Sequence, residues 1–132
     1  MKRVLIVDDD EVFRRVLSVN LQAAGYETQT ADNGRTALRL CRQHSFDLVI
    51  TDIVMPEKEG LETIIELRRS WPEVMIIAIS GDSRMDPGDY LPMARQLGAN
   101  QILAKPFTSE DIVKLVATTS PGAVQIGTPF SV

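Results

Sequence analysis

Val4-Leu5-Ile6-Val7-Asp8-Asp9-Asp10 is a run of four apolar residues that leads directly into three aspartates. An uninterrupted apolar run of this length is typical of a strand covered on both faces. Three carboxylates crowded at its end repel one another, so they need a cation. Residues 47–52, which read Asp-Leu-Val-Ile-Thr-Asp, repeat the arrangement, and two later strand-like runs end at Ser80 and Lys105. Four strand ends therefore carry polar groups suited to phosphate chemistry.

The size and composition indicate one globular domain. The chain has 132 residues, of which 44% are hydrophobic and 24% charged, as in soluble proteins with a single core. We expect a domain over residues 1–119 and a flexible tail or truncated linker over residues 120–132, where Pro and Gly recur without a helical period. No apolar run is long enough to span a bilayer, and the first one is too short for a signal peptide. We therefore expect a cytoplasmic protein without a membrane partner.

Charge and cysteine content exclude several classes of function. The net charge is −4 and no long basic run is present, which gives little electrostatic reason for direct nucleic-acid binding. Cys41 is the only cysteine, so an internal disulfide and a thiolate metal cluster are excluded. Its helical, apolar surroundings predict a packed structural thiol.

Short apolar runs alternate with segments of helical period along the chain, a pattern typical of an α/β protein built on a parallel sheet. The second strand is the most polar, so we expect it at an edge. Five helical segments separate or follow the strands and give a (βα)5 order. The predicted strands are Arg3–Val7, Tyr26–Thr30, Leu48–Thr51, Met75–Ile79 and Gln101–Ala104.

Right-handed crossovers with helices on both faces favour a doubly wound sheet with the flavodoxin-like strand order 2-1-3-4-5. Ligands bind such sheets where the chain reverses direction, beside the first strand. The first and third strands are then neighbours, and Asp8 and Asp9 face Asp52 across the crevice at the carboxyl ends. We interpret Asp10 and Asp47 instead as solvated loop residues.

Four short motifs, taken together, resemble the receiver domain of response regulators in two-component signalling. They occur in the order typical of that family and cover roughly residues 2 to 118, and their joint pattern is more specific than any one of them. The motifs are Val7-Asp8-Asp9-Asp10, Asp52-Ile53-Val54-Met55-Pro56 with Gly60 beyond, Ile79-Ser80-Gly81, and Lys105-Pro106-Phe107.

The resemblance implies a magnesium site around a phosphoacceptor. Asp52 would accept the phosphoryl group, while Asp8, Asp9, Asp52 and the backbone carbonyl of Val54 would hold Mg²⁺. Physical chemistry is consistent with these roles, because Mg²⁺ prefers hard oxygen ligands and keeps several waters. A carboxylate is also a competent nucleophile toward a phosphoryl group whose charge is neutralised.

The same resemblance assigns the remaining polar groups and the partners. Lys105 would bind a second phosphoryl oxygen and the Ser80 hydroxyl a third. The donor would be a histidine kinase or a histidine phosphotransfer protein. An unknown downstream protein would bind the surface formed by the fourth helix, fifth strand and fifth helix, on a monomer or a phosphorylation-dependent dimer. An aromatic switch residue is common three positions before the lysine, where this chain has Ile102.

Two other functions remain open at the level of sequence. Residues 8–12 also fit the Asp-x-Asp-x-(Thr/Val) opening of haloacid-dehalogenase-type phosphatases, in which Asp8 would be the nucleophile. Those enzymes need a further acidic pair after the lysine, whereas here only Glu110 and Asp111 follow, at a predicted helix start. A flavodoxin-like cofactor binder fits by fold alone, but the acidic first loop lacks the glycines and hydroxyls that cradle a phosphate.

Overall fold

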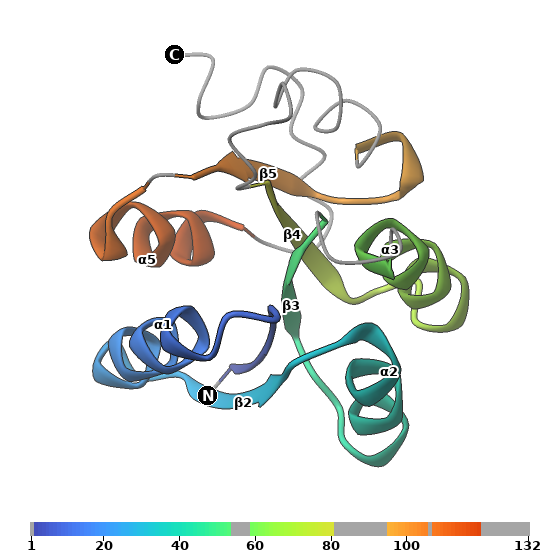
Figure 1. Cartoon of the computed structure of the whole chain (residues 1–132), viewed down its shortest axis with the longest axis horizontal. Coiled ribbons are helices and arrows are strands. Elements are labelled where there is room, and N and C mark those ends of the chain that lie inside the picture. The colour runs from blue at the N-terminus through green and yellow to red at the C-terminus, as the bar shows by residue number, and fades with distance from the viewer. Residues whose placement is uncertain (1, 54–58, 81–94, 106, 120–132) are drawn as a thin grey trace.

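A computed structural model describes residues 2–53, 59–80, 95–105 and 107–119. Five parallel strands form one sheet, in the order β2-β1-β3-β4-β5, between two layers of helices (Figure 1). The predicted fold class and strand order are confirmed. In chain order the elements are β1 (Arg3–Val7), α1 (Glu11–Ala23), β2 (Glu27–Ala31), α2 (Gly34–Gln43), β3 (Leu48–Asp52), α3 (Glu59–Ser70), β4 (Met75–Ser80), β5 (Gln101–Ala104) and α5 (Ser109–Thr118).

Alternating side chains of the strands supply two separate cores. In β1, Val4 and Ile6 pack with α1 and α5, whereas Leu5 and Val7 pack with α2 and α3. All four are at most 1% exposed, which explains why their sequence shows no alternation of apolar and polar residues. Figure 1 shows the two helical layers on opposite sides of the sheet, with α1 and α5 on one face and α2 and α3 on the other.

The predicted second strand is wrong by one residue at each end. Tyr26 is instead part of the turn that follows α1, because its backbone N–H donates to Leu21 O at 3.1 Å. The preceding Gly25 has φ +99°, a conformation that ends the helix at little steric cost. The ladder with β1 begins at Glu27 and extends to Ala31, whose carbonyl accepts from Asp8 N at 3.1 Å. The strand does lie at an edge of the sheet, as predicted.

Two further strands extend one residue beyond their predicted ends, and both added residues belong to the predicted site. Asp52 is paired with Ile79 in the ladder between β3 and β4, and Ser80 is paired with Ala104 in the ladder between β4 and β5. Asp52 and Ser80 therefore have their backbones fixed by the sheet rather than by loops.

Helix ends follow the local sequence. Thr108 and Asp111 form a reciprocal capping box at the start of α5. Helix α3 ends at Ser70, directly before Trp71-Pro72, because the residue before a proline avoids helical geometry. Residues 95–97 are helical before Gly98, while the rest of the predicted fourth helix and the predicted tail lie outside the described residues. Among the described helices, none is both long enough and apolar enough to cross a membrane.

Cys41 is expected to react slowly with alkylating reagents in the folded protein. Burial raises the pKa of its thiol from 9.0 to about 11, so at pH 8 about a hundredfold less thiolate is present than for a free cysteine. Because the folded pKa is the higher one, the protein should also lose stability as the pH rises from about 9 to about 11. Iodoacetamide labelling in buffer and in urea checks this, and equal rates in both would contradict it.

Candidate functional site

Asp8 and Asp9 lie directly after β1 and differ sharply in exposure. The Asp8 residue is 1% exposed, whereas Asp9 is exposed to solvent. One Asp8 carboxylate oxygen accepts from Asp10 N at 2.9 Å, and the Asp8 carbonyl accepts from Arg14 Nη1 at 2.6 Å. These contacts hold the carboxylate and the backbone of Asp8 in place, whereas the carboxylate of Asp9 stays open to water.

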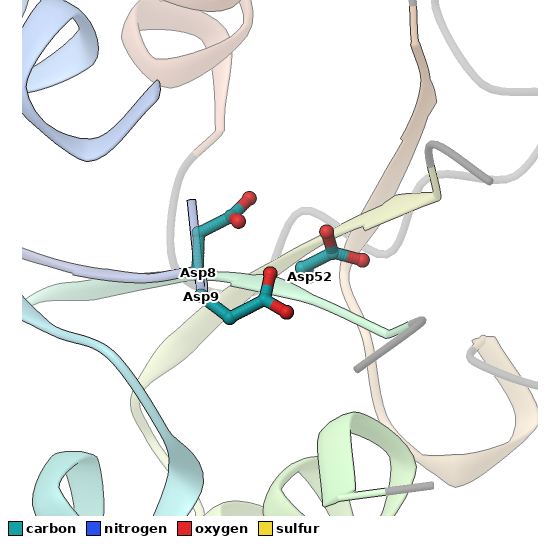
Figure 2. A group of neighbouring side chains, drawn as sticks. All are labelled: Asp8, Asp9 and Asp52. Carbon is teal, nitrogen blue, oxygen red and sulfur yellow. The ribbon is translucent and has the colours of Figure 1, made fainter. Parts of the chain in front are cut away.

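Asp52 completes an acidic cluster with these two residues. It ends β3, the neighbour of β1, and is only 5% exposed. Asp8, Asp9 and Asp52 each offer one carboxylate oxygen, and these three oxygens lie within 4.8 Å of one another. Figure 2 shows the three side chains gathered at the ends of the two strands.

The chemistry of this donor set fits a hard divalent cation. Its ligand atoms are all carboxylate oxygens, and the exposed Asp9 leaves a side through which an ion and its waters can enter. Mg²⁺ prefers one or two carboxylates together with retained water molecules in an octahedral shell. Asp8, Asp9 and Asp52 are therefore consistent with a Mg²⁺ site. The fourth predicted ligand, the carbonyl of Val54, lies outside the described residues.

Lys105 reaches the same cluster from the end of β5. Its Nζ lies 3.2 Å from Asp8 Oδ2 and 3.6 Å from Asp52 Oδ2, and the lysine side chain is 24% exposed. The ammonium thus offsets part of the negative charge of both buried carboxylates. The pKa of Asp8 is nevertheless raised above 3.8, because burial outweighs the Asp10 hydrogen bond and the attraction of Lys105.

Ser80 is the last predicted member of the site. It ends β4 and is 1% exposed, and its backbone carbonyl accepts from Lys105 N at 2.8 Å. Its hydroxyl is buried and makes no hydrogen bond with the described part of the protein. A buried hydroxyl without a partner is unfavourable by itself. The side chain is therefore a spare donor at the carboxyl edge of the sheet.

A comparison with known families explains why these groups occur together. The family profile of the response regulator receiver domain matches residues 4–117. The chain belongs to this family. A receiver domain is a signalling phosphoacceptor of two-component systems rather than a true enzyme. Membership implies a histidine kinase partner, and it favours the receiver hypothesis over the phosphatase alternative.

Individual relatives of this receiver domain differ in length. The response regulator receiver protein CpdR of Brucella abortus is 35% identical over 115 residues, which are 86% of this chain and 92% of CpdR. The DNA-binding transcriptional regulator NtrC of Azospirillum brasilense is 32% identical over 126 residues. The match covers 92% of this chain but only 26% of NtrC, so the receiver domain spans about a quarter of that relative.

A solved structure of a response regulator has the same fold. The receiver domain resembles the response regulator TrrA of Thermotoga maritima with a TM-score of 0.77 and 35% identity, over 89% of this chain and 97% of TrrA. That structure is a complex of TrrA with Mg²⁺-BeF. The likeness agrees with an acidic cluster of the kind that Asp8, Asp9 and Asp52 form in this receiver domain.

Two residues near the site, Asp10 and Gly60, make contacts that were not predicted from the sequence. Asp10, interpreted as a solvated loop residue, is the N-cap of α1 and accepts from Val12 N and Phe13 N. An aspartate directly before a helical segment is the signal that predicts such a cap. Gly60 lies on α3 against the backbone of Asp52, a contact that no local pattern indicates.

A cavity elsewhere in the molecule is unrelated to this cluster. It is lined by residues at the amino ends of β1, β3 and β4, among them Trp71, Met75 and Val4. The acidic cluster lies at the carboxyl ends of the strands, at the opposite edge of the sheet. We take the charged cluster as the site, because phosphoryl transfer needs placed charges rather than an apolar pocket.

Proposed function

We propose that Asp52 is the residue that accepts the phosphoryl group, and that Asp8, Asp9, Asp52 and the Val54 carbonyl hold Mg²⁺. One observation carries the proposal. The carboxylate of Asp52 shares a cluster with Asp8 and Asp9 and lies 3.6 Å from Lys105 Nζ. When bound, Mg²⁺ supplies neutralisation of negative charge on the phosphoryl oxygens.

The residues of the chain perform the remaining work of transfer. A carboxylate oxygen of Asp52 forms a bond to phosphorus while the bond from phosphorus to the donor imidazole nitrogen breaks and leaves its electron pair on that nitrogen. The Lys105 ammonium, which already lies beside both carboxylates, then pairs with a phosphoryl oxygen, because the new group carries more negative charge. Ser80 gains an acceptor for its buried hydroxyl.

The new hydrogen bond of Ser80 distinguishes the phosphorylated state of the protein from the unphosphorylated state. The hydroxyl makes no hydrogen bond with the described residues before transfer and donates to the phosphoryl group afterwards. The surface formed by the fourth helix, β5 and α5 follows Ser80 and Lys105, since Ser80 ends β4 and Lys105 comes directly after β5. Ile102 packs against the core on the α2 and α3 face and has no ring to swing inward.

The partners that we propose follow from this chemistry. The donor is a phosphohistidine on a histidine kinase or a histidine phosphotransfer protein, and an unknown downstream protein binds the switched surface. The receiver domain covers residues 1–119 and is a monomer or a phosphorylation-dependent dimer. It works in the cytoplasm and binds no nucleic acid directly, as its net charge of −4 favours.

Trapping the acyl phosphate tests the assignment of Asp52. The protein is incubated with acetyl phosphate and Mg²⁺, reduced with borohydride, and digested for peptide mass spectrometry. We expect homoserine at position 52, with none in EDTA and none in Asp52→Asn. Asp32→Asn, which changes an exposed carboxylate, is the control and should be labelled like the wild type. Label at Asp8 would contradict the proposal and support the phosphatase alternative.

A further inference from the structure

The ammonium group of Lys105 has a third neighbour besides the two carboxylates. Its Nζ lies 4.1 Å from the centroid of the Phe13 ring, over the ring face. The distances to Asp8 and Asp52 are 3.2 and 3.6 Å. The cation is therefore held between two carboxylates and one aromatic face. A cation at this distance from a ring is attracted by the negative potential of the face.

The position of Phe13 is fixed from two directions. It lies in the first turn of α1, where its backbone N–H donates to the capping carboxylate of Asp10 at 3.2 Å. The Phe107 ring meets it edge to face, with centroids 5.8 Å apart and planes at 79°. Both rings are partly buried against the core on the α1 and α5 face. Phe13 is thus an aromatic platform rather than a freely moving side chain.

We propose that Phe13 is a positioning residue that holds Lys105 Nζ between Asp8 and Asp52, where the phosphoryl group arrives. This inference rests on the proposed function of Lys105 and Asp52. The carboxylates attract the ammonium in the unphosphorylated protein, and both also serve the metal ion. The ring is neither a metal ligand nor an acceptor of the phosphoryl group. Its attraction for the ammonium is therefore not changed by metal binding or by phosphorylation. It keeps the lysine in place while the charges around it change.

The alternative is that Phe13 only fills space in the core. A volume role depends on the size of the side chain, whereas a cation–π role depends on the electron density of the ring. The two are separable, because fluorine atoms withdraw electron density from the face with little change in size. Phe46 offers a matched control, since it is also partly buried but packs against the other core, before the amino end of β3.

The experiment measures Asp52 phosphorylation by acetyl phosphate in Mg²⁺ for two sets of proteins. One set carries mono-, di- and trifluorophenylalanine at position 13, and the other carries Phe13→Leu, Phe13→Tyr and Phe46→Leu. We expect the logarithm of the rate to fall steadily with each fluorine. Phe13→Leu should lose about tenfold and Phe13→Tyr less than about twofold, while Phe46→Leu keeps the wild-type rate.

A nuclear magnetic resonance measurement gives a readout that does not depend on activity. Lys105 Nζ lies over the Phe13 ring, so the protons on the neighbouring Cε should be shifted upfield by the ring current, and the shift should vanish in Phe13→Leu. A flat fluorine series, or Lys105 shifts equal in wild type and Phe13→Leu, would overturn the inference. If the wild type is not labelled at Asp52, the proposed function fails, while the Lys105 shifts still decide whether Phe13 holds the lysine.

Discussion

Gly60→Ala is expected to destabilise the receiver domain by about 3 kcal/mol and lower its Tm by about 10 °C. A Cβ atom at this position would lie 2.3 Å from the Asp52 carbonyl oxygen and 2.5 Å from the Ile53 Cα. Both neighbours are backbone atoms of the sheet end, since Ile53 N donates to Ile79 O at 2.8 Å. Relief of the clash therefore has to move either α3 or the end of β3, which carries Asp52.

The same substitution should impair the site, because the backbone that must shift carries Asp52. We expect weaker Mg²⁺ binding and slower phosphorylation at temperatures where the variant is still folded. Urea unfolding and acetyl phosphate labelling measure the two effects. Gly25→Ala is the matched control: its φ of +99° strains alanine, but no atom lies within 4 Å of the added Cβ. It should be less stable by about 1 kcal/mol and keep wild-type labelling. Wild-type stability in Gly60→Ala would contradict the role of this contact.

The sheet could be predicted from sequence because its strands are short apolar runs between helical segments. Val4–Val7 has no polar residue to place on a solvent face, so it needs a helix on each side, and this requirement led to the doubly wound order. The ends of strands were less well predicted. Tyr26 is β-prone by type but closes the turn after α1, because Gly25 at positive φ lets its backbone N–H reach the Leu21 carbonyl. At this position the local hydrogen bond after the helix outweighs the strand propensity of tyrosine.

The convergence of Asp8, Asp9 and Asp52 was also predictable, since it follows from strand order alone. The contacts of Phe13 and Gly60 were not. Phe13 fits the apolar face of α1, and only the tertiary packing shows that Lys105 Nζ lies 4.1 Å over its ring. Gly60 was part of the motif that begins at Asp52, but its closeness to the Asp52 carbonyl depends on how α3 packs on β3. Contacts between distant segments leave no periodic trace in a sequence.

Asp8→Asn is expected to slow phosphorylation by about a thousandfold, because the buried ligand of the proposed Mg²⁺ site is lost. The same change should raise the free energy of unfolding in EDTA. Burial raises the pKa of Asp8 above 3.8 despite Lys105 and the Asp10 hydrogen bond, so its negative charge is unfavourable in the folded state at neutral pH. An asparagine has no charge to bury, and its amide oxygen can still accept from Asp10 N.

The raised pKa of Asp8 also predicts how the stability difference between Asp8→Asn and the wild type changes with pH. Because the folded pKa of Asp8 is raised, the folded protein holds this proton more tightly than the unfolded chain does, and stability falls as the pH rises through the folded pKa. The Asp8→Asn variant has no carboxylate at this position and should not lose stability in this way. The variant and the wild type should therefore differ most at neutral pH in EDTA, and the difference should shrink as the pH falls toward 3.8.

Asp9→Asn distinguishes the loss of a metal ligand from the loss of a buried charge. Asp9 belongs to the same cluster but is exposed, so its removal should weaken Mg²⁺ binding without stabilising the apo protein. Added Mg²⁺ at about a hundred times its Kd should stabilise the wild type by about 2.7 kcal/mol and either variant far less. A lower free energy of unfolding for Asp8→Asn in EDTA would mean that the Lys105 pair outweighs burial. The buried charge of Asp8 would then be stable without a metal ion, whereas we expect bound Mg²⁺ to offset the cost of burying that charge.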